Sequence, residues 1–226
     1  MTTSGTTALT TTAGDLIADA MGLLGVLAAG ETISGDDYAL GLRFLNLTVK
    51  QMAARPGRWL AADVTHTVTP GTSSYTVGSG LNIDTARPQG LLAARRRDSA
   101  GTELEVEVVS RDEYMNLSNK TLQAPVQMAY YDPQRANGVL YVWPTGSSGN
   151  TTIVLTFQRP VEIFTSVADD VDLPEEYALM MTYRLAVMLG PSYAGTPQAV
   201  ASESERLWLL WELADCESAS VKVRPR

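Results

Sequence analysis

The spacing of apolar residues changes twice along this chain of 226 residues. It follows the helical repeat from Asp15 to Arg55, alternates from Trp59 to Pro160, and becomes helical again from Asp172 to Asp215. Helices and strands bury different faces, so a chain with this order folds as an α+β protein. Each helix is apolar on one side, and two helices alone bury little surface. We therefore expect a helical bundle built from the N- and C-terminal helix pairs, with an antiparallel β-sandwich or barrel module inserted between them.

Capping residues mark the predicted helix boundaries. Capping-box pairs, in which a Ser or Thr is followed three residues later by an acidic residue, occur at Thr12–Asp15, Ser34–Asp37 and Ser110–Glu113. They predict helices over residues 15–29 and 35–55 and a short helix after Ser110. Gly30 is the expected stop of the first helix. A third helix should begin after Asp172–Glu175 and end at Gly190, and a fourth should run from Pro197 to Asp215.

The central region carries short alternating segments separated by turn residues. We expect strands over residues 64–69, 74–77, 91–97, 103–109, 126–131, 139–143 and 151–158. The turns at Asp98–Gly101 and Asp132–Gly138 predict two hairpins.

These patterns divide the chain into four parts. Residues 1–13 are rich in Thr and Ser and form a predicted flexible N-terminal arm. Residues 14–58 and 171–215 form the predicted helical bundle, and residues 59–170 the predicted antiparallel β module. Residues 216–226 form a basic C-terminal arm, which either binds an acidic groove on another subunit or is a disordered end.

Composition excludes several classes of protein. The 17 Lys and Arg against 25 Asp and Glu give a formal net charge of -8, which argues against general nucleic-acid binding. Such a surface would let DNA pass without holding it. The segment Met1–Gly14 lacks the features of a signal peptide, and the longest apolar run, Met21–Ala29, is too short to span a bilayer.

No residue pattern predicts catalysis, a metal ion or a cofactor. The single His66 and single Cys216 cannot form a zinc site or a disulfide framework. His66 stands within a predicted strand, with no nucleophile elbow in the chain. Three acidic pairs lie near helix starts, where the helix dipole explains them: Asp36–Asp37, Asp169–Asp170 and Glu175–Glu176.

Three segments are candidate interaction surfaces. Arg95, Arg96 and Arg97 either contact DNA or an acidic partner, or form a cross-strand charge ladder with the glutamates of the next strand, which we favour. Trp208 and Trp211 are either core residues or a subunit contact. The basic arm is the third.

Two other functions remain open from the residues alone. A carbohydrate-binding β module would require an exposed platform of aromatic rings, with candidates Tyr130, Tyr131, Tyr141 and Trp143. A carboxylate-dependent hydrolase would require two acidic residues that converge in a cleft.

Several short motifs occur in a familiar order. They are Ala18–Glu31, Asp37–Ala54 with Leu45-Asn46 at its centre, Ser74–Gly78, Arg87-Pro88, Val139–Pro144, Leu173–Tyr177 and Arg184–Ala186. In order and spacing they resemble the head-to-tail adaptor family of tailed bacteriophages, also called tail accessory factors or packaged-DNA stabilisation proteins. The resemblance covers most of residues 14–215.

The resemblance implies a structural protein and not an enzyme. It implies a location in the virion neck, and in the host cytoplasm during assembly. It implies a ring of twelve copies under the portal protein that extends the DNA channel, retains packaged DNA and provides a docking platform for a tail, nozzle or tail-terminator protein. Family members grip the portal with a C-terminal segment. That role would fall here on the residues Lys222, Val223, Arg224, Pro225 and Arg226. Neither a membrane nor a cofactor is implied.

Overall fold

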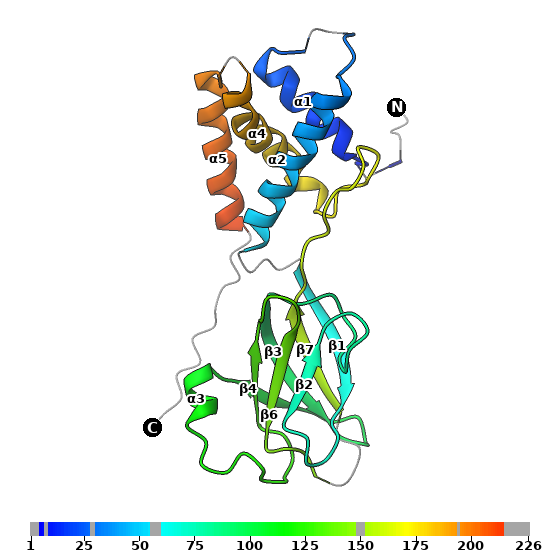
Figure 1. Ribbon diagram of the computed structural model, residues 1–226, viewed down its shortest axis with the longest axis vertical. Helices are drawn as coiled ribbons and strands as arrows, with labels where there is room; N and C mark the ends of the chain where they lie inside the picture. The colour runs from blue at the N-terminus through cyan, green and yellow to red at the C-terminus, as the bar shows by residue number, and fades with distance from the viewer. Residues whose placement is uncertain are drawn as a thin grey trace. The chain divides into compact units, whose positions relative to one another are not determined.

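A computed structural model describes residues 5–6, 9–27, 30–54, 60–147, 152–193 and 195–214. The chain forms two compact units, one from Met1–Arg58 with Val161–Arg226 and the other from Trp59–Pro160 (Figure 1). The helical unit contains α1 (Ala13–Leu24), α2 (Gly35–Ala53), α4 (Ala178–Leu189) and α5 (Gln198–Ala214). The β unit contains seven strands and α3 (Arg111–Met115). The α+β class is thus confirmed.

The predicted caps set the beginnings of the first helices. Thr12 and Asp15 form a complete capping box at α1, and the Ser34 side chain accepts a hydrogen bond from the backbone N–H of Asp37 at α2. The end of α1 differs from the expectation. Gly25, with φ of 70°, adopts the left-handed conformation and terminates the helix before Gly30.

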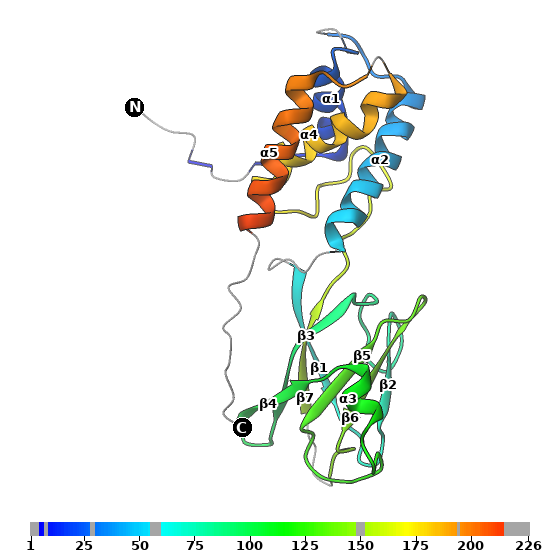
Figure 2. The ribbon, with the colours of Figure 1, turned by 90° about the vertical axis from the view of Figure 1, so that its left-hand side faces the viewer.

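Helix α4 contacts each of the other three helices of its unit. In Figure 2 it lies between α5 and α2. Its buried residues include Met181, Leu185 and Leu189. On the other side of the core, Gly41 of α2 touches Ile17 of α1, where a Cβ would lie 2.7 Å from an Ile17 methyl carbon. A larger residue at position 41 would therefore push α1 and α2 apart.

A loop from the end of the β unit belongs with the helices. The Asn46 side chain of α2 donates a hydrogen bond to the Phe164 carbonyl and accepts one from the Phe164 N–H, both at 2.8 Å. Residues 161–170, expected in the β module, are therefore held by the helical unit. The same loop pairs with the chain start, because Ala13 and Gly14 donate to the carbonyls of Asp169 and Val167. The last residues of the expected flexible arm are thus hydrogen-bonded.

The seven strands form one curled sheet, a half-barrel, where a sandwich or barrel was expected. They are β1 (Ala61–Thr67), β2 (Ser74–Val77), β3 (Gly90–Arg97), β4 (Glu103–Val108), β5 (Met128–Asp132), β6 (Gly138–Trp143) and β7 (Thr152–Gln158). Their order in the sheet is β1-β7-β3-β4-β5-β6-β2. Both predicted hairpins, β3–β4 and β5–β6, are confirmed.

One strand pair corrects the antiparallel expectation. Strands β4 and β5 are parallel, with Glu107 opposite Met128. The connection between them runs through α3, and a parallel pair requires such a crossover in place of a tight turn. The concave core of the sheet contains Leu140, Leu155 and Phe157, which are almost completely buried.

Candidate interaction surfaces

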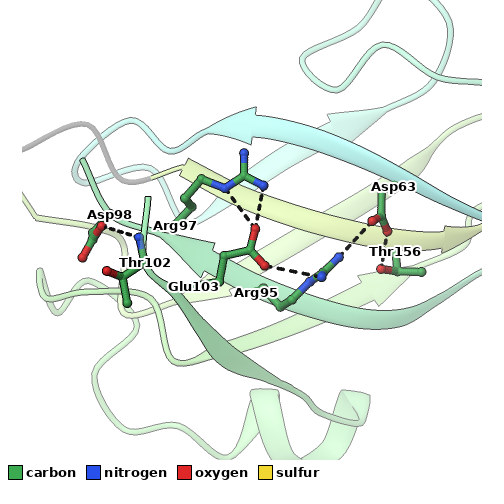
Figure 3. A network of polar contacts seen from close by, with 7 residues as sticks. All are labelled: Asp63, Arg95, Arg97, Asp98, Thr102, Glu103 and Thr156. Carbon is green, nitrogen blue, oxygen red and sulfur yellow. Dashed lines mark hydrogen bonds and ion pairs between the residues drawn. The ribbon is translucent and has the colours of Figure 1, made fainter. Parts of the chain in front are cut away.

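The arginine-rich strand β3 carries a network of ion pairs on one face of the sheet (Figure 3). Arg97 lies opposite Glu103 of β4 in the strand register, and its guanidinium Nη2 is 2.6 Å from the Glu103 carboxylate. Glu103 also lies 3.4 Å from Arg95 Nη1. The charge ladder favoured from the sequence is therefore present, although Arg95 reaches diagonally to Glu103.

The network continues across the sheet to the edge strand β1. Arg95 Nη2 donates to Asp63 at 2.9 Å, and the Thr156 hydroxyl of β7 donates to the same carboxylate (Figure 3). The hydrogen bond from Thr156 and, to a smaller extent, the Arg95 guanidinium lower the pKa of Asp63. Arg96 points to the opposite face, where its Nη1 is 3.5 Å from the Val126 carbonyl. Two of the three arginines are thus neutralised within the chain.

Trp208 and Trp211 belong mainly to the interior of the helical unit. Trp211 is 6% exposed and packs edge-to-face against Tyr177. Trp208 stacks under the Arg184 guanidinium at 4.7 Å and donates from Nε1 to Glu212 at 2.6 Å. These contacts give the two tryptophans a role in joining α5 to α4.

The exposed apolar side chains of α5 are its leucines. Leu209, Leu210 and Leu213 are 58%, 49% and 75% exposed. Where α4 and α5 pack together, some buried polar atoms have no hydrogen-bond partner within the described residues: Ser204 Oγ, Trp211 Nε1 and Arg184 Nε. Because Trp211 is buried and these leucines are exposed, the last turns of α5 carry apolar side chains on both the packed and the exposed side. Exposed apolar side chains of this kind are typical of a helix that a partner covers. The sequence did show this feature, since seven of the eight residues in Leu207–Ala214 are apolar.

Of the four rings in the candidate aromatic platform, Tyr130 and Tyr131 are buried, and Tyr141 and Trp143 are partly buried. Tyr130 stacks on Tyr141 at 5.7 Å, and Tyr114 of α3 covers both rings in a small second core. Tyr131 lies on the other face, where its hydroxyl donates to the Pro88 carbonyl at 2.8 Å and burial raises its pKa to about 12. Trp143 donates from Nε1 to the Asn119 carbonyl. Tyr130 and Tyr131 therefore cannot contribute their faces to an exposed platform, and Tyr141 and Trp143 remain partly exposed.

The acidic pairs have structural partners. Asp37 accepts hydrogen bonds from Ser34 and from the Tyr193 hydroxyl, and both lower its pKa. Asp169 accepts from the backbone N–H groups of Thr165 and Ser166, which lower its pKa. Glu175 accepts from the Leu9 N–H at a pocket of about 190 Å³ that Asp170 also lines. One of the two carboxylates in this pocket is therefore engaged in binding the chain start.

His66, the single histidine, lies against Tyr75, with ring centroids 4.6 Å apart. Burial lowers its pKa, and its Nε2 has no hydrogen-bond partner in the described structure. Across the described ranges no three His, Cys, Asp or Glu side chains converge as a metal site. None of the described helices is long and apolar enough to cross a membrane. The expected portal-binding residues, Lys222, Val223, Arg224, Pro225 and Arg226, lie outside the described residues.

Comparison with known protein families decides the identity of this fold. A family model described as SU10 adaptor protein matches residues 11–208. The chain belongs to the SU10 adaptor protein family. The resemblance to phage head-to-tail adaptors is thereby confirmed, and this family is structural and not enzymatic. The match spans both units of the adaptor and ends within α5, one residue before Leu209. No curated protein matches the chain.

Proposed function

We propose that this adaptor protein forms a ring of twelve copies under the portal in the neck of a tailed phage. The ring extends the DNA channel, helps retain packaged DNA and provides a docking platform for tail components. The observation that carries the proposal is the family match, because it includes the helical unit and the whole β unit in one continuous range. Assembly takes place in the host cytoplasm.

The presence of two compact units supports separate roles for the helices and for the β unit. In the proposal, the four helices form one bundle that builds the ring and meets the portal, and the β unit meets tail proteins. The net charge of -8 per chain is consistent with such a ring, since an acidic lumen repels the phosphate backbone and lets the duplex move. Each subunit stays monomeric until the portal templates the ring.

The basic C-terminal arm is the proposed grip on the portal. Lys222, Arg224 and Arg226 place three cations within five residues, and no acidic residue follows Glu217. Such a segment suits an acidic groove on the portal, with Val223 and Pro225 as spacers between the cations.

The test is electron microscopy of the full chain with its assembled portal, beside the chain alone. The proposal expects a ring stacked on the narrow end of the portal, with twelve repeats in averaged views. A portal that stays bare at micromolar adaptor concentration would contradict it.

A charge variant tests the grip. Replacing Lys222, Arg224 and Arg226 with Ala should weaken portal binding and reduce its salt dependence. A matched variant with three cations of the β unit, Arg111, Lys120 and Arg135, replaced by Ala should bind normally. Equal loss in both variants would show a general charge effect and not an arm.

A further inference from the structure

The outer faces of α2 and α5 carry complementary patterns. On α2, Arg43, Leu47 and Lys50 follow one another at steps of four and three residues, and all three are exposed. On α5, Glu205, Leu209 and Glu212 follow the same steps. In both helices a leucine more than half exposed stands between two like charges. The charges are basic on α2 and acidic on α5.

This spacing matches the two faces residue by residue. Positions seven residues apart lie about 10.5 Å apart along a helix and on the same side of it. A helix laid alongside in the same direction places Arg43 against Glu205, Leu47 against Leu209, and Lys50 against Glu212. Apolar contact flanked by opposite charges is the arrangement that joins helices in coiled coils.

The charges at one end of the matched pattern, Arg43 and Glu205, have no ion pair within the described residues, and the other two groups each make a hydrogen bond within the chain. Lys50 donates to the Val161 carbonyl at 3.1 Å and keeps two further N–H donors. Glu212 binds Trp208 through one oxygen and keeps acceptor capacity on its carboxylate. Two other charged groups border the faces: Asp36 at the start of α2, and Arg206, which is paired with Glu203.

The two faces cannot meet within one copy, because α4 lies between α2 and α5 (Figure 2). Two α5 faces set against each other would oppose glutamates, which is unfavourable. We therefore propose that α5 of one copy docks on α2 of the next copy, with Leu209 and Leu213 covered by the surface around Leu47. Different faces joined in this way repeat around a ring, so the contact deepens the proposed function and rests on it.

Cysteine cross-linking tests the contact directly. In a C216S background, L47C and L209C chains are mixed and treated with a short bismaleimide, in solution and with the portal. With the portal present, we expect a covalent dimer only when both variants are mixed, and a ladder of multimers when one chain carries both substitutions. In solution, where the proposal keeps the subunits monomeric, we expect little cross-linking. The control pairs L209C with L104C, because Leu104 of β4 is 49% exposed and comparable to Leu47 at 51%.

A charge exchange tests the register. E205K and R43E should each lower the cross-linking yield about two- to fivefold, the effect of one exposed ion pair. The combined R43E/E205K chain should restore it, since every copy then presents both reversed charges.

The outcomes separate this contact from the adaptor role. A ring on the portal without L47C–L209C cross-linking above the L104C control overturns the α5–α2 contact alone. Cross-linking in solution with a bare portal supports the contact and contradicts the portal role. Two further results overturn the contact. The first is an L209C thiol that a small maleimide cannot reach in the monomer, because the chain then covers its own α5. The second is an α5 that the portal protects without any cross-linking to L47C.

Discussion

Strand β3 and the C-terminal half of α5 were both candidate interfaces in the sequence, and they leave very different surfaces for a partner. Arg95 and Arg97 form ion pairs with Glu103 and Asp63 within the β unit. On α5 the inner tryptophans are packed, and the outer leucines remain exposed. Among the described residues of the β unit, the most exposed large apolar side chain is Leu104, at 49%, whereas Leu213 of α5 reaches 75%. The arginine run thus already has partners within its own unit, whereas the end of α5 leaves apolar side chains exposed for a partner to cover.

The largest expected effect is a difference in stability between substitutions on the buried side and on the exposed side of α5. Trp211→Ala removes a buried ring that contacts Tyr177 and Trp208, and should cost about 3–5 kcal/mol in the free energy of unfolding of the helical unit. Leu213→Ala, on the outer side, should change it by less than about 0.5 kcal/mol. Urea unfolding followed by circular dichroism at 222 nm measures both. Equal effects would show that α5 packs in another orientation.

A smaller effect is expected in the β3 network. Glu103→Gln removes the charge that Arg95 and Arg97 share on a partly exposed face, so the β unit should lose about 0.5–1 kcal/mol. The loss should shrink in high salt. Arg135→Gln, which removes an exposed charge of the β unit outside this network, serves as the comparison in thermal unfolding. A loss for Glu103→Gln that is unchanged at high salt would mean that packing and not charge holds this face.

The same network predicts a pH effect that is smaller still. Hydrogen bonds lower the folded-state pKa of Asp63, so the stabilisation is present above its unfolded pKa and is lost as pH falls through the lowered value. Thr156→Val removes the main hydrogen bond, and the pKa of Asp63 should rise. Carboxyl chemical shifts in an NMR titration report the value. A pKa that stays low in Thr156→Val would assign the shift to Arg95.

His66 should add acid sensitivity of its own to the β unit. Burial lowers its folded-state pKa, so the unfolded chain binds protons more readily and stability falls as pH drops below the unfolded value. His66→Phe keeps a ring against Tyr75 and should remove this component. Unfolding midpoints at pH 5 and pH 7 for both chains test it, and an unchanged difference between the two pH values would contradict it.

Local patterns predicted the elements of this fold and missed several long-range contacts. Periodicity placed the helices and strands in order, because burial of one face follows directly from residue spacing. The caps at Thr12 and Ser110 were also visible in the sequence. The parallel β4–β5 pair depends on how α3 crosses the sheet, and no residue in either strand encodes that choice. The attachment of residues 161–170 to the helices depends on Asn46 meeting Phe164, 118 residues away.

The sequence singled out the α5 and β3 segments as candidates, but it did not show which of their residues are exposed. Trp208 and Trp211 were chosen as large apolar residues, yet Leu209 and Leu213 occupy the outer side of the same helix. Where nearly every residue of a helix segment is apolar, as in Leu207–Ala214, the sequence does not indicate which side packs against the rest of the protein. Similarly, the glutamates on β4 predicted the ladder, but the participation of Asp63 was not predicted. Asp63 lies on the edge strand β1, and β7 pairs with both β1 and β3, which places Asp63 within reach of Arg95.

Hydrogen exchange measured on the free chain and on the portal-bound ring tests the central comparison most directly. We expect new protection in Glu205–Leu213 of α5 and Ala39–Lys50 of α2, with no change in Gly90–Arg97 of β3. Protection of β3 with unchanged exchange in α5 would contradict it, and would place the assembly contact on the arginine strand.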